Sequence, residues 1–187
     1  TIPLAWKARQ PSQDLESLSR SWLGSDHEPV KRLMAASWLL SSRDRSSFIT
    51  VLNAFAKHPS DPISDLAMAQ MWTNQIVTMK ESELDHWSHQ IQAMSNRLRG
   101  GPYYLLGKAS ARFNRPDDAV LAFLRLPSMY AEDHSLARSA LFESAKLMQE
   151  SGHTAEAIRL YRETIKLDGK AVESSQARQQ LSRLVND

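Results

Sequence analysis

One arrangement of small and aromatic residues occurs twice in the second half of the chain. Its two copies are Tyr103-x-x-Leu106-Gly107 with Ala119-x-x-x-Phe123, and Leu141-x-x-Ser144-Ala145 with Ala157-x-x-x-Tyr161. In each copy the second small residue, Ala119 or Ala157, follows the first by twelve positions. Two antiparallel helices can approach to about 8–10 Å where their side chains are small, and larger side chains fill the space on either side. The pattern therefore predicts two closely packed helix pairs.

Helical periodicity also dominates the rest of the chain, and no segment has the alternation that is typical of β-strands. Between residues 12 and 100, apolar residues recur at intervals of three and four, and the segments are separated by prolines or by Gly100-Gly101-Pro102. Residues 126–133 are expected to form a longer connection. Residues 171–186 have one apolar and one polar side, which predicts a terminal capping helix.

The repeated arrangement resembles the tetratricopeptide repeat, whose pattern runs W-x-x-L-G-x-x-Y, then A-x-x-x-F, then P. The resemblance covers residues 102–169, where equivalent residues lie 38 positions apart. Ser110 and Met148 stand where the family often has Tyr, and Gly169 stands where it usually has Pro. The resemblance implies an all-α fold, a right-handed α-solenoid of antiparallel helix pairs with a C-terminal capping helix.

These observations predict one helical-repeat domain over residues 1–187. Residues 12–100 would form divergent helix pairs, residues 102–169 two tetratricopeptide-like repeats, and residues 171–186 the cap. All five tryptophans precede residue 88, so the N-terminal part could instead be a separate helical subdomain.

Composition restricts the class of partner. The chain has 42% hydrophobic and 24% charged residues, which is ordinary for a globular protein. Its formal net charge is only +2, and no basic block stands out, which disfavours nucleic acid. No apolar run approaches the roughly 20 residues that a membrane span needs. Cysteine is absent, and the start at Thr1 slightly favours an exported or periplasmic protein over a cytoplasmic one.

The resemblance also implies which side chains line the concave, partner-binding face. Carried over position by position, these are Tyr104, Lys108, Ala111 and Arg112 in the first repeat and Phe142, Lys146, Gln149 and Glu150 in the second. An aromatic residue followed four positions later by lysine thus occurs in both. Aromatic and cationic groups together suit an acidic or C-terminal peptide segment. Solvated lysines beside core aromatic residues would give the same pattern.

No residue set in the sequence predicts catalysis, a cofactor or a metal. His86 and His89, with Asp85 beside them, could share a helix face, but no second cluster supplies further ligands. There is no G-x-S-x-G motif and no glycine-rich phosphate loop. We therefore expect a non-enzymatic scaffold that binds a partner protein or peptide. One alternative is a homo-oligomer formed through an end of the solenoid. Another is an accessory or oligomerisation domain of a larger polypeptide, such as a cell-envelope protein or an enzyme.

Overall fold

The computed structural model describes residues 4–7, 10–24, 26–42 and 44–186. Within these residues every regular element is a helix, ten α-helices and one short 3-10 helix, so the expected all-α class is confirmed. Both ends of the predicted domain, residues 1 and 187, lie outside the described residues. The chain forms two compact units, an N-terminal unit (Thr1–Glu83 and His89–Pro102) and a C-terminal unit (Leu84–Ser88 and Tyr103–Asp187).

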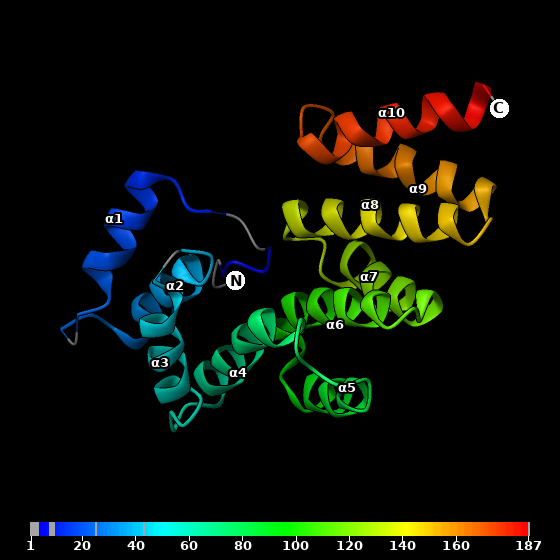
Figure 1. Cartoon of the computed structure of the whole chain (residues 1–187). Coiled ribbons are helices and arrows are strands. Elements are labelled where there is room, and N and C mark those ends of the chain that lie inside the picture. The colour runs from blue at the N-terminus through cyan, green and yellow to red at the C-terminus, as the bar shows by residue number, and fades with distance from the viewer. Residues whose placement is uncertain (1–3, 8–9, 25, 43, 187) are drawn as a thin grey trace. The chain divides into compact units, whose positions relative to one another are not determined.

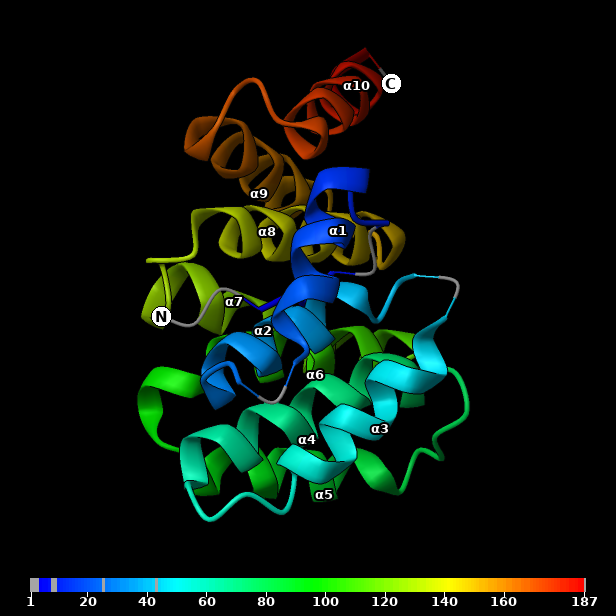
Figure 2. The same ribbon diagram turned by 90° about the vertical axis from the view of Figure 1, so that its left-hand side faces the viewer.

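The N-terminal unit contains α1 (Gln13–Trp22), α2 (Pro29–Leu39), α3 (Arg45–Phe55) and α4 (Asp61–Gln75), with α1 packed on α2, α2 on α3 and α3 on α4 (Figure 2). The Ser12 hydroxyl caps α1 by accepting a hydrogen bond from the Leu15 amide at 3.3 Å. Further along, α5 (Glu83–Ala93) ends before Met94, whose backbone is extended, and the short helix η1 (Asn96–Leu98) follows. Local capping and turn chemistry therefore set where these helices begin and end.

A buried polar contact ties the first described residues to the core of the N-terminal unit. The Ser37 hydroxyl accepts a hydrogen bond from the Ala5 amide and donates one to Gln70 Oε1, both at 2.7 Å. Trp6 is buried and lies directly against Gly101, where an added Cβ would come within 1.9 Å of its ring. Glycine at position 101 is therefore required by the close approach of the indole.

The C-terminal unit is built mainly from α6 (Gly100–Arg112), α7 (Pro116–Met129), α8 (His134–Glu150), α9 (Thr154–Leu167) and α10 (Val172–Asn186). Helices α7 to α10 pack in chain order, α7 on α8, α8 on α9 and α9 on α10 (Figure 1). The connection expected over residues 126–133 is shorter than predicted, because α7 continues through Pro127 to Met129. Proline removes one backbone donor near the end of this helix, and the Tyr130 amide still donates to Leu126 O at 2.9 Å.

The two repeat-like helix pairs turn in the same way. Each turn has a residue with positive φ, Asn114 at 55° and Gly152 at 81°, and these positions are 38 apart. In each turn the amide of the following residue donates a hydrogen bond to the carbonyl five positions earlier. These equivalent bonds run from Arg115 N to Ser110 O at 3.0 Å and from His153 N to Met148 O at 2.8 Å. This is the bond pattern of a left-handed helix C-cap, which glycine and asparagine adopt most readily. The sequence period is thus also a period in backbone geometry.

Aromatic packing repeats with the same offset. The Tyr104 and Phe123 rings are 5.5 Å apart with an interplanar angle of 55°, and those of Phe142 and Tyr161 are 5.8 Å apart at 53°. A Cβ added to Gly107 would lie 2.7 Å from the Phe123 ring, which explains the small residue at this helix crossing. In each helix pair, therefore, an aromatic ring of the first helix packs against an aromatic ring of the second helix, next to a small residue.

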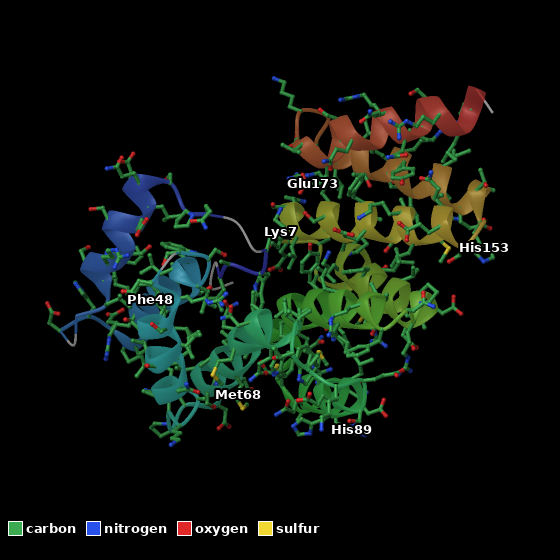
Figure 3. The ribbon with its side chains drawn as sticks, in the orientation of Figure 1. Lys7, Phe48, Met68, His89, His153 and Glu173 are labelled. Carbon is green, nitrogen blue, oxygen red and sulfur yellow. The ribbon has the colours of Figure 1, made fainter. Side chains whose placement is uncertain are left out.

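Helix α10 is fixed to the preceding pair by charged and polar contacts. Arg138 of α8 forms ion pairs with Asp168 at 3.3 Å and with Glu173 at 3.4 Å. Glu173, at the start of α10, also accepts a hydrogen bond from the Ser139 hydroxyl at 2.7 Å, and Figure 3 shows it beside α8. Apolar contacts complete the docking, since Ala177 of α10 is buried with Leu160 and Tyr161 of α9.

Candidate functional site

A cavity of about 480 Å³ lies between α8, α9 and α10 of the C-terminal unit. We call it the α8–α10 cavity, and its size is in the range of sites that hold small ligands or short peptide segments. Its lining combines two aromatic rings, two carboxylates, one lysine and four glutamines. These residues are Phe142, Glu143, Lys146, Gln149, Glu150, Tyr161, Gln176, Gln179 and Gln180.

Four of the residues expected on the concave face, Phe142, Lys146, Gln149 and Glu150, line this cavity together. They lie at spacings of four, three and one on α8, so one face of the helix presents all of them. The Lys146 ammonium lies 5.8 Å from the centre of the Phe142 ring, which is a cation–π distance. Figure 3 shows the end of this helix, where His153 marks the turn into α9.

The corresponding residues of α6 are placed differently and do not line the cavity. Tyr104 is only 6% exposed, with its ring against Phe123, so little of the ring can reach a partner. Lys108 extends to α8, and Arg112 lies over the Phe113 ring at 4.7 Å. The lysine of the aromatic–lysine couple is therefore accessible in both repeats, as Lys108 and Lys146. The aromatic residue lies at the cavity only in the second repeat, as Phe142.

Glu143 connects the two predicted lysines. Its carboxylate accepts Lys108 Nζ at 3.3 Å and Lys146 Nζ at 3.1 Å, with about a fifth of its side chain exposed. Sequence reasoning missed this residue. Glu143 lies three residues before Lys146 on the same helix, and this spacing could have indicated their ion pair. The ion pair between Glu143 and Lys108 joins two different helices, so it cannot be predicted from local spacing.

The floor of the cavity contains a hydrogen bond that only the second repeat can form. The Tyr161 hydroxyl donates to Gln149 Oε1 at 2.8 Å, whereas the equivalent positions 38 residues earlier are Phe123 and Ala111. Burial, followed by the nearby Glu150 and Glu143 carboxylates, raises the pKa of Tyr161 from 10.0 to about 12. Burial, with Glu143 and Glu173, also raises the pKa of Tyr104. The neutral phenol is thus favoured at both positions.

The glutamines of α10 also escaped sequence reasoning. Their helix was expected to cap the fold with a solvated polar face, and nothing in a polar face indicates that part of it closes a cavity. Gln176 and Gln179 are exposed and Gln180 is half-buried. The apolar residues Ala177, Leu181 and Leu184 pack against the core, and the three glutamines line the α10 side of the cavity.

The two histidines that could have shared a metal ion, His86 and His89, lie on the solvent-exposed surface. His86 and His89 are both exposed on α5, and Figure 3 shows His89 at the surface. Throughout the described residues, no group of three or more histidine, cysteine, aspartate or glutamate side chains is arranged to hold a metal ion. No described helix combines the length and apolar character that crossing a membrane requires.

Comparison of the chain with protein-family models, with curated proteins and with solved structures finds no match. The tetratricopeptide resemblance therefore stays a prediction that depends on this chain's own residues and geometry.

Proposed function

We propose that this chain is a non-enzymatic helical-repeat module of the tetratricopeptide type, a right-handed solenoid that binds a partner protein or peptide. The observation that carries the proposal is the α8–α10 cavity, because residues of three successive helices converge on it. Its lining offers amide groups, charges and aromatic surface, a set that suits hydrogen bonding and stacking with polypeptide.

The recurrence of backbone and ring geometry supports the repeat assignment. Turn conformations, the hydrogen bonds around them and the aromatic pairs all return after 38 residues. A structural unit that recurs in this way stacks its copies on one another and leaves one surface for binding. Helix α10 has Gln180 at the position of Tyr104 and Phe142, so the aromatic ring of the first two positions is not repeated there.

Site-specific photo-crosslinking tests the proposal. A photoreactive amino acid at Gln179, on the rim of the cavity, should form a covalent adduct with a partner polypeptide in extracts of the source cells. The same amino acid at Ser182, exposed on α10 but outside the cavity lining, is the matched control. Mass spectrometry of the adducts identifies what was captured.

We expect one polypeptide sequence to be recovered repeatedly at position 179 and not at position 182. A peptide of that sequence should then compete with the crosslink. Equal capture at the two positions, or none at position 179, would contradict a partner-binding role for this cavity.

A further inference from the structure

The two lysines that suggested an acidic ligand are already engaged within the molecule. Lys108 and Lys146 both contact the Glu143 carboxylate, at 3.3 and 3.1 Å. A ligand carboxylate would have to compete with Glu143 for these ammonium groups and would itself be repelled by it. An acidic segment therefore gains little at this end of the cavity.

Glu150 is placed differently from Glu143. It lines the opposite end of the same face of α8 with an exposed side chain, and no described cation forms an ion pair with it. The lining has two carboxylates and one ammonium group, and a second ammonium group, that of Lys108, contacts Glu143 from outside the lining. Glu150 is thus the charged group of the lining that no described cation pairs with.

The four glutamines define a second requirement. A carboxamide has one acceptor oxygen and two donor hydrogens, which is the complement of a peptide group. Gln149 uses its oxygen for the Tyr161 hydroxyl and keeps its NH₂ group as a donor, while Gln176, Gln179 and Gln180 stand along the α10 side. Such a row can bond the main chain of an extended segment without reading its side chains.

We propose that the α8–α10 cavity binds an extended polypeptide segment whose lysine or arginine side chain pairs with Glu150 while the glutamines bond its main chain. This inference rests on the proposed function and specifies its ligand. It replaces the acidic peptide expected from the sequence with a basic one. The chain as a whole is slightly cationic, with a formal net charge of +2, so attraction of a basic segment has to arise locally at the cavity.

Binding of short synthetic peptides to the full chain tests the inference. The peptides carry one uncharged dye and differ only in whether their central residues are lysine, glutamine or glutamate, and fluorescence anisotropy measures their affinity. We expect the lysine peptide to bind tightest and the glutamate peptide weakest. Glu150→Gln should weaken the lysine peptide about threefold to tenfold and leave the glutamine peptide unchanged. The lysine preference should also decline as salt is added.

Two matched controls separate the cavity from general charge effects. Glu156→Gln changes the net charge equally from an exposed position on α9 outside the lining, and it should leave all three affinities unchanged. Gln179→Ala should weaken all three peptides alike, whereas Ser182→Ala should not. Circular dichroism confirms that each variant keeps its helical content.

The outcomes distinguish this inference from the proposed function. Tighter binding of the glutamate peptide, equal binding of all three, or equal effects of Glu150→Gln and Glu156→Gln would overturn the basic-segment assignment. None of these results would affect the crosslinking at position 179. Absence of binding by every peptide also overturns the inference, because main-chain recognition predicts measurable affinity for a generic basic segment.

Discussion

At the scale of single residues, the phenol of Tyr161 links the cavity to the stability of the fold. Its pKa is raised from 10.0 to about 12, first by burial and then by Glu150 and Glu143. A group whose pKa is higher in the folded state keeps its proton there after the unfolded chain has lost it. Its contribution is complete below pH 10 and is lost as the pH rises towards 12, so the free energy of unfolding should fall over this interval.

Replacing Tyr161 by Phe should remove part of this alkaline loss. The variant also loses the hydrogen bond to Gln149, so we expect it to be less stable at neutral pH by about 1 kcal/mol and to depend less steeply on pH between 10 and 12. Urea unfolding followed by circular dichroism at a series of pH values measures both effects. Phe123 occupies the equivalent position of the preceding repeat, so we expect position 161 to accommodate phenylalanine.

Glu150→Gln supplies the complementary measurement. It removes one of the carboxylates that raise the pKa of Tyr161, so the phenol should ionise at lower pH, as seen in the ultraviolet absorbance of the phenolate. A titration that is unchanged in Glu150→Gln would show that Glu150 does not act on the hydroxyl.

At the scale of elements, one carboxylate near the start of α10 makes two of the polar contacts that hold this helix. Glu173 accepts the Ser139 hydroxyl and pairs with Arg138, whose side chain is only 11% exposed. Glu173→Ala would leave a buried hydroxyl and a nearly buried guanidinium with fewer partners. We expect a loss of about 1–3 kcal/mol and faster hydrogen exchange of the amides of α10.

Glu163→Ala is the matched control for this prediction. Its ion pair with Lys166 spans 3.7 Å between side chains that are 50% and 79% exposed, so its removal should cost less than about 0.5 kcal/mol. Equal destabilisation by the two substitutions would show that Glu173 does not have a special role in holding α10.

The elements also show what could be predicted from the sequence and why the rest could not. Local side-chain chemistry accounts for the capped start of α1 at Ser12 and for glycine at position 152, where φ is positive. It failed at Pro127, because a proline in the last turns of a helix removes a single hydrogen bond and the remaining contacts of α7 hold the helix. The connection predicted over residues 126–133 was therefore too long, but the predicted order of the helices was not affected.

The candidate site was harder to predict because it is assembled from distant segments. The resemblance to the tetratricopeptide repeat placed Phe142, Lys146 and Gln149 on one face of a helix, and all three line the cavity. The contact between Lys108 and Glu143, and the placement of Gln179 at the cavity, depend on how α6 and α10 pack against α8. Packing of this kind is decided by buried surfaces across the whole unit and leaves no periodic pattern in the sequence.

At the scale of the whole molecule, the division into two units separates the chain's aromatic residues by type. Trp6, Trp22, Trp38 and Trp72 belong to the N-terminal unit, whereas all four tyrosines belong to the C-terminal unit. Trp87 is the exception, as it is buried in the C-terminal unit. In a Trp87→Phe protein, indole fluorescence would therefore report on the N-terminal unit alone.

This distribution allows the cooperativity of the chain to be measured. Leu52 of α3 is fully buried in the N-terminal unit, and Leu52→Ala should destabilise that unit by about 2–5 kcal/mol because it leaves a cavity. In the Trp87→Phe background we expect the fluorescence midpoint to move to lower urea, while the amides of α8 and α9 keep their protection from hydrogen exchange. This expectation follows from the division of the chain into two units that each have their own buried residues. If α8 and α9 lose their protection from hydrogen exchange as well, the whole chain unfolds as one cooperative body. A substitution that destabilises the N-terminal unit would then also destabilise the folded α8–α10 cavity.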